Sequence, residues 1–169
     1  MSAAVALLMG GITLGGMYAI RHASGKGQAK WVANILAEAT GKPTINIGAK
    51  RDKWGDIKCD IEPHGGVIYA NIESMPQFAD KTFSVALVSH VIEHVEHPED
   101  ALKEVQRIAD NVVVILPSPL DIATWVDPQH KWVFFGGSKV RIDPSIIAAM
   151  MTTIGLGVLI GIGCSRRKS

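Results

Sequence analysis

The sequence has few cysteines, few aromatic residues and almost no net charge. Its two cysteines, Cys59 and Cys164, lie far apart without paired spacing, which argues against a disulfide framework and for a reducing compartment. The 17 basic residues nearly balance the 16 acidic ones, and aromatic residues make up only 6% of the chain. Because no basic run is interleaved with aromatic residues, the bulk charge gives no sign of a nucleic-acid partner. A chain of 169 residues is long enough for one domain with a buried core.

Charge is missing altogether from residues 2–20. This run is close to the roughly 20 residues that a helix needs to cross a bilayer. Small residues recur in it at a four-residue spacing, as at Gly11 and Gly15, and such faces let transmembrane helices pack closely. A buried core helix is the alternative, but internal glycines would weaken it in water, and a cleaved signal peptide would need a basic residue before the run. We therefore expect an uncleaved apolar anchor helix, spanning the membrane, within residues 1–22.

The rest of the chain, residues 23–169, is expected to form the folded domain. Arg21, Lys26 and Lys30 follow the apolar run, whereas only the α-amino group precedes it. The positive-inside rule then places the domain on the cytoplasmic side of a membrane, held by a single-pass anchor.

Residues 146–164 form a second run without charge. A second membrane span is one interpretation of this run. Against it, Gly155 divides the run, and the basic tail that follows would lie on the wrong side of the membrane. We expect a final helix followed by a final strand.

Between these ends, apolar runs alternate with amphipathic segments, which predicts an α/β domain. Helices are expected over residues 28–39 and from Pro98 onward, and strands over residues 44–47, 57–61, 67–72, 83–88 and 112–116. The last two strands are continuously apolar, as is typical of central strands in a parallel sheet that is covered on both faces. Ligands bind such open sheets at the carboxyl ends of the strands, so the first place to look for a site is Ser89–His90 and Pro117–Ser118.

An ordered series of short motifs narrows the fold further. The series resembles the class I S-adenosylmethionine-dependent methyltransferases, and most closely their small, divergent type 11-like branch, over roughly residues 44–135. The resemblance implies a Rossmann-like methyltransferase sandwich with a mostly parallel sheet, and S-adenosylmethionine as the cofactor. The motifs that carry it are Ile45-Asn46-Ile47-Gly48-Ala49, Gly55, Asp60-Ile61, Ala70-Asn71-Ile72-Glu73-Ser74-Met75-Pro76, Asp80-Lys81-Thr82-Phe83-Ser84-Val85, Ser89-His90-Val91-Ile92-Glu93-His94-Val95 and Ala101-Leu102-Lys103-Glu104-Val105-Gln106-Arg107.

The resemblance also implies which residues bind the cofactor. Gly48 would let the backbone approach the amino-acid part of the cofactor, because no side chain intervenes. Asp60 would accept hydrogen bonds from the two ribose hydroxyls. Asn46 stands where the family has an acidic residue, and Lys50 stands where it has a second glycine.

Two further pairs complete the implied site. Asn71 and Ile72 would flank the adenine, and Ser89 and His90 would contact the methionine part or the substrate. The sequence shows no motif for the methyl acceptor, and no catalytic base is assigned.

His90-Val91-Ile92-Glu93-His94 also matches the His-x-x-Glu-His pattern of inverted zinc peptidases. On a helix, His90 and His94 would share a face and bind zinc, with Glu93 as the base. The motif directly follows an apolar strand, which favours His90 as a loop residue, with Glu93 and His94 opening a helix and bonding locally. We therefore assign no metal ligands and keep the zinc peptidase as the least favoured alternative.

Two functions remain from the sequence. The first is a membrane-anchored methyltransferase-like protein that uses S-adenosylmethionine on an unknown acceptor. The second is a degenerate methyltransferase fold that serves as a structural or assembly subunit of a membrane complex. An open pocket at Gly48 and Lys50 would favour the first function, and a filled pocket would favour the second. Aromatic and polar residues also follow the last apolar strand. They would either overhang the cleft and shape an acceptor pocket or cap the core, and they are Trp125, Asp127, His130 and Trp132.

Overall fold

The computed structural model describes residues 12–14, 17–21, 25–135 and 138–143, together with Ser145, Ala148 and Thr152. Its main feature is a seven-stranded sheet in the order β1-β2-β7-β6-β3-β4-β5. Every neighbouring pair in this sheet is parallel except β1–β2. The strands are β1 (Ile12–Leu14), β2 (Met17–Arg21), β3 (Thr44–Ile47), β4 (Ile57–Asp60), β5 (Ile68–Tyr69), β6 (Phe83–Ser89) and β7 (Ala109–Leu116).

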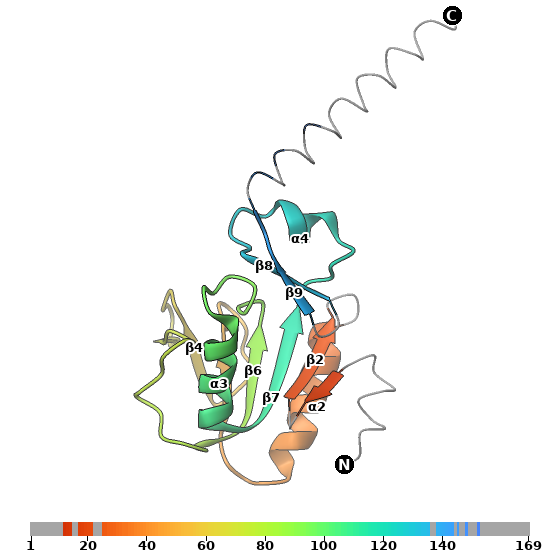
Figure 1. The fold of residues 1–169 in the computed structure, drawn as a ribbon. Coiled ribbons are helices and arrows are strands. Elements are labelled where there is room, and N and C mark those ends of the chain that lie inside the picture. The colour runs from red at the N-terminus through yellow and green to blue at the C-terminus, as the bar shows by residue number, and fades with distance from the viewer. Residues whose placement is uncertain are drawn as a thin grey trace, which may run out of the picture.

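Helices cover both faces of the sheet, as Figure 1 shows for α2 (Gly25–Glu38) and α3 (Pro98–Ile108). Alternate residues of β6 point to opposite faces: Val85 and Leu87 pack with the apolar stripe of α2, whereas Ala86 and Val88 belong to the core beneath α3. Both central strands are therefore buried on both sides, which confirms the interpretation of their continuously apolar sequences.

The anchor helix expected over residues 1–22 is wrong for the residues that the structure describes there, because β1 and β2 are strands. All five residues of β2 pair in parallel with β7, from Met17 opposite Val112 to Arg21 opposite Leu116. A charge-free run fits a buried sheet as well as it fits a bilayer, so neither its length nor its small residues distinguish the two structures. Within the described residues, no helix has the length and apolar character needed to span a membrane. Residues 1–11, 15–16 and 22–24 lie outside the description.

The other predicted elements are confirmed with adjusted ends. The helix expected over residues 28–39 begins earlier, at Gly25, and the strand expected over 67–72 shrinks to Ile68–Tyr69. The last apolar strand begins at Ala109, directly where α3 ends. The predicted final helix and strand over 146–164 lie outside the described residues, apart from Ala148 and Thr152, which are helical.

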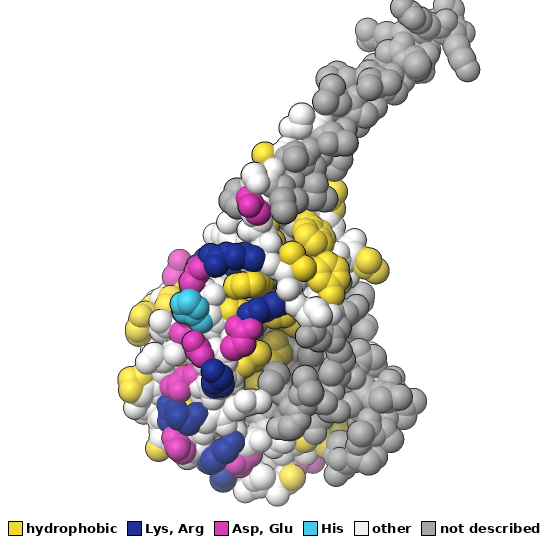
Figure 2. Space-filling model, in the orientation of Figure 1, with side chains coloured by type: hydrophobic (Ala, Val, Ile, Leu, Met, Phe, Trp, Pro, Cys, Tyr) yellow, Lys and Arg dark blue, Asp and Glu magenta, His cyan; other side chains and the backbone are white. Residues whose placement is uncertain are grey.

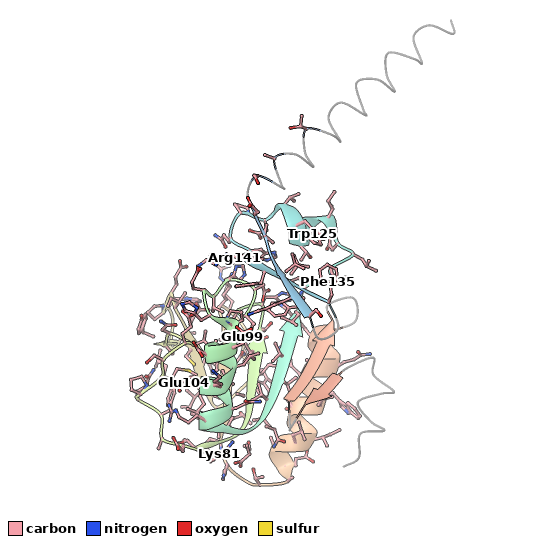
Figure 3. All side chains as sticks on the ribbon, in the orientation of Figure 1. Lys81, Glu99, Glu104, Trp125, Phe135 and Arg141 are labelled. Atoms are coloured by element: carbon pink, nitrogen blue, oxygen red, sulfur yellow. The ribbon has the colours of Figure 1, made fainter. Side chains whose placement is uncertain are left out.

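The sequence did not predict the elements that follow β7. They are α4 (Ile122–Val126) and an antiparallel hairpin of β8 (Trp132–Phe135) and β9 (Ser138–Arg141), and they lie beyond the carboxyl ends of β6 and β7 (Figure 1). Trp125 of α4 and Phe135 of β8 face one another in Figure 3, with ring centroids 5.8 Å apart. Hydrophobic side chains gather on this part of the surface in Figure 2, and the exposed ones include Leu120, Ile122, Val126, Phe135 and Val140.

Candidate functional site

A pocket of about 920 Å³ opens at the carboxyl ends of β3, β4 and β6. The strand order reverses between β3 and β6, since the chain proceeds from β3 to β4 and β5 on one side and continues from β6 to β7 on the other. Open α/β sheets bind ligands at such a reversal. The lining residues are Lys26, Asn46, Gly48, Ala49, Lys50, Arg51, Asp52, Asp60, Glu62, His64, Ser89 and His90.

Gly48 forms the turn after β3 and needs to be glycine for two reasons. Its φ of +75° lies in the left-handed region. A Cβ atom at this position would lie 2.2 Å from Val91 Cγ2 and 3.1 Å from the Ser89 carbonyl oxygen. The main chain of the β3 turn therefore passes close to the segment after β6, and it lines the pocket without a side chain.

Asp60 ends β4 with its carboxylate in the pocket wall. The residue is only 7% exposed. Its Oδ2 accepts a hydrogen bond from the Lys50 main-chain N–H (3.1 Å), and its Oδ1 accepts one from the Glu62 main-chain N–H (3.1 Å). Each oxygen keeps a further lone pair, so the fixed carboxylate can accept hydrogen bonds from hydroxyl groups of a ligand.

Asn46 lies at the bottom of the pocket and is fully buried. Its Nδ2 donates to the Trp54 carbonyl oxygen at 3.1 Å. Its Oδ1 has no hydrogen-bond partner among the described residues, which is costly for a buried acceptor. A donor group of a ligand would satisfy this oxygen.

Cys59 lies beside Asn46 and Asp60 but has no sign of reactivity. It is fully buried, and its thiol lies 3.6 Å from the Asn46 carbonyl oxygen. Burial, together with the charge of Asp60, raises the pKa of the Cys59 thiol to about 12. The thiol therefore stays protonated at neutral pH and serves as packing.

The loop after Gly48 brings charges of both signs to the rim of the pocket. Lys50 takes the left-handed conformation without being glycine, with a φ of +44°. Lys30 of α2 forms an ion pair with Asp52, with Nζ and Oδ2 2.7 Å apart. Burial would raise the pKa of Asp52, but the hydrogen bonds from Lys30 and Trp54 and the charges of Lys30 and Lys26 lower it overall. Asp52 therefore stays ionised and holds the loop to α2.

Ser89 and His90 end β6 and line the same pocket. His90 has a φ of +54°, so the chain turns sharply there. Its Nδ1 lies 3.1 Å from Oε1 of Glu93, a residue that is fully buried. The helix that the zinc-peptidase alternative requires is absent, because residues 91–94 form a turn and α3 begins only at Pro98. Likewise, Glu93 and His94 do not open a helix.

Asn71 and Ile72 follow β5 but are not among the residues that line the pocket. Asn71 uses its Oδ1 to accept from the Glu73 main-chain N–H at 3.0 Å, which closes a turn. Ile72 is 4% exposed and belongs to the core cluster beneath α3. The structure thus brings Asn46, Gly48, Asp60, Ser89 and His90 together around one pocket and leaves the other two predicted site residues outside it.

A mostly parallel sheet with helices on both faces and a pocket at its strand reversal defines a Rossmann-like α/β fold. The family model described as a methyltransferase domain matches residues 29–112, which run from α2 into β7. The match to this methyltransferase domain family is consistent with a class I S-adenosylmethionine-dependent methyltransferase. No curated protein and no solved structure matches the chain.

Proposed function

We propose that the protein binds S-adenosylmethionine in the pocket at the ends of β3, β4 and β6 and is a methyltransferase for an unidentified acceptor. The observation that carries the proposal is Asp60, a buried strand-end carboxylate that two main-chain N–H groups hold at the pocket wall. The family match supports the same ligand, since methyltransferase domains of this family generally bind it.

The residues around the pocket fit the polar groups of this cofactor. Asp60 has lone pairs for the two ribose hydroxyls. Gly48 lines the pocket with bare backbone, which can meet the amino-acid part of the cofactor directly. The buried Asn46 Oδ1, without a partner among the described residues, would accept from the cofactor's ammonium group. Lys26, Lys50 and Arg51 lie at the rim and would attract its carboxylate.

When bound, the cofactor supplies a methyl group that its sulfonium has already activated. The contribution of the protein is then to hold that methyl group in line with an acceptor and to keep water away. Ser89 and His90 lie on the side of the pocket toward β6, and α4 with the β8–β9 hairpin lies beyond the ends of β6 and β7 (Figure 1). We place the acceptor between Ser89 and His90 on one side and α4 with the β8–β9 hairpin on the other.

The test is a binding titration of the full chain with S-adenosylmethionine and S-adenosylhomocysteine. A ligand present at about 100 times its Kd, and bound only by the folded state, adds about 2.7 kcal/mol to stability, which is visible as a higher Tm. Asp60→Ala should weaken binding by about tenfold or more, because charge-assisted hydrogen bonds each contribute about 1.5–3 kcal/mol.

Asp100→Ala is the matched control, because Asp100 lies exposed at the start of α3, away from the pocket lining. It should bind like the unmodified protein. Equal affinity of the Asp60 and Asp100 variants would remove Asp60 from the site. If neither ligand raises the Tm of the unmodified chain, the fold serves a structural role instead.

A further inference from the structure

Three side chains that can bind a metal meet beside the pocket, from two segments of the chain. They are Glu93 and His94, after β6, and His130, between α4 and β8. One potential ligand atom of each lies within 4.8 Å of those of the other two. The imidazole rings of His94 and His130 have centroids 4.8 Å apart and are tilted by 56°.

Glu93 is the buried member of this Glu93–His94–His130 cluster. It is 0% exposed, and its Oε1 lies 3.1 Å from His90 Nδ1. Its Oε2 is buried as well and has no hydrogen-bond partner among the described residues. A buried carboxylate oxygen without a partner is costly, and it is relieved when it coordinates a cation.

In both imidazoles, a carbonyl contact at Nδ1 leaves Nε2 available to a metal. His94 Nδ1 lies 3.0 Å from the Gln129 carbonyl oxygen, and His130 Nδ1 lies 2.8 Å from the Thr124 carbonyl oxygen. A carbonyl can only accept, so Nδ1 carries the proton in each ring and Nε2 is left with the lone pair. A backbone carbonyl on the far nitrogen is the usual support of a histidine that binds a metal.

The main chain already holds the two segments in place. The Lys131 and Trp132 N–H groups both donate to the Glu93 carbonyl oxygen, at 2.8 and 3.2 Å. The Trp132 indole N–H donates to the Val95 carbonyl oxygen at 3.0 Å. Asp127 adds negative charge near the same nitrogen, with Oδ2 3.8 Å from His130 Nε2. The cluster is thus preorganised by contacts that do not involve a metal.

We propose that Glu93, His94 and His130 form a site for a divalent transition metal, with zinc as the best fit. Two imidazole nitrogens and one carboxylate oxygen form a known zinc ligand set that leaves a fourth position open, whereas magnesium and calcium prefer oxygen ligands alone. Bonds of about 2.0–2.2 Å place tetrahedral ligand atoms about 3.3–3.6 Å apart, so the side chains close inward on the ion.

The position of this site gives it two consequences. The ion fastens the segment between α4 and β8 to the loop after β6, on the side where we place the acceptor. Glu93 also contacts His90, which lines the cofactor pocket, so one carboxylate links the metal to that pocket. The open fourth position then faces a water molecule or a group of a ligand.

The site is tested on the full chain, freed of metal with a chelator and titrated with Zn²⁺ by calorimetry. We expect one Zn²⁺ per chain. His130→Gln should weaken the affinity more than about 100-fold, since even the loss of a partner outside the coordination shell costs 10–100-fold. Glu93→Gln, which keeps the size of the side chain, should do the same. His97→Gln is the control, because His97 lies exposed on the same loop, outside the cluster.

X-ray absorption on the zinc-loaded, unmodified protein gives a second measurement that does not depend on variants that may fail to fold. It should show two imidazole ligands and a carboxylate oxygen at about 2.0–2.2 Å. Absence of one-to-one binding, equal effects of the His130 and His97 variants, or a shell without two imidazoles would each overturn the proposal. The titration needs no S-adenosylmethionine, so its outcome is separate from that of the proposed function.

Discussion

The two halves of the sheet, on either side of the β3–β6 boundary, build their carboxyl ends in different ways. The half with β3, β4 and β5 comes from one continuous stretch, residues 44–69. Its part of the pocket depends on the main chain, through the turn at Gly48 and the N–H groups that fix Asp60. The half with β6, β7 and β2 joins segments that are far apart in the sequence.

The contacts at the ends of this second half are correspondingly long-range. Glu93 receives main-chain hydrogen bonds from Lys131 and Trp132, and His94 contacts Gln129. A site built by a local turn leaves a recognisable motif, whereas a site assembled from distant side chains leaves only scattered residues. The turn at Gly48 is therefore visible in the sequence, whereas the long-range contacts at the ends of the second half become visible only in three dimensions.

The largest expected effect comes from removing part of the second half. Deleting residues 1–22 takes away β1 and β2 and leaves the apolar strand β7 as an unpaired edge. Such an edge promotes aggregation, so we expect the truncated chain to be largely insoluble or unfolded. Solubility after expression and the far-ultraviolet circular dichroism of any soluble fraction measure this.

Deleting residues 1–11 is the matched control, because it keeps both strands. This shorter deletion should retain more folded protein than the longer one. A soluble, folded product from the longer deletion would mean that β2 adds little to the stability of the sheet. The second half would then depend less on distant segments than we infer.

The sequence predicts the first half well because its signals are local. The strand expected over 44–47 matches β3, and the motifs that contain Gly48 and Asp60 place both residues at the pocket. The buried strands β6 and β7 are also predicted, since a short, continuously apolar run in an α/β domain is typical of a strand that is covered on both faces.

The sequence predicts the second half less well because its partners are distant. Residues 2–20 have the composition of a membrane helix, and only the pairing of β2 with β7 shows that part of this run is strand. The pattern from His90 to His94 suggests a helical metal site, yet His90 turns away in the left-handed region and His130 supplies the further imidazole. Nothing in the local sequence connects residues 94 and 130, so this cluster could not be predicted.

The next effect concerns the turn of the first half. Gly48→Ala should destabilise the protein in two ways, through the left-handed φ and through the collision of the new Cβ with Val91. Gly65→Ala shares the first cost, with a φ of +50°, but has nothing within 4 Å of the new Cβ. We expect about 1–2 kcal/mol for Gly65→Ala and about 1–3 kcal/mol more for Gly48→Ala. Urea unfolding of both variants measures the difference.

The same pair of variants also bears on the pocket. Gly48→Ala should weaken S-adenosylhomocysteine binding, since the backbone of the turn must move, whereas Gly65→Ala should leave it unchanged. Equal losses of stability in the two variants would show that the close approach to Val91 is relieved at no cost.

The smallest expected effect also lies in the first half and tests whether its loop is held electrostatically. Asp52→Asn removes the ion pair between the loop after β3 and Lys30 of α2. Because the pair is partly exposed, we expect a loss of less than about 1 kcal/mol near neutral pH. The pKa of Asp52 is lowered in the folded state, so its contribution to stability is present above its ordinary value of 3.8 and is lost as the pH falls through the folded pKa.

The difference in unfolding free energy between the unmodified protein and Asp52→Asn should therefore shrink as the pH falls below the ordinary value of 3.8. Urea titrations near neutral pH and in acid measure it, with Asp100→Asn, which loses an exposed pair with Lys103, as the matched exchange on α3. A difference that stays constant with pH would show that Asp52 acts through neutral hydrogen bonds, for instance with the Trp54 main-chain N–H at 2.9 Å. In that case hydrogen bonds within the loop, rather than the ion pair to α2, would hold it, and the contrast with the second half would become sharper.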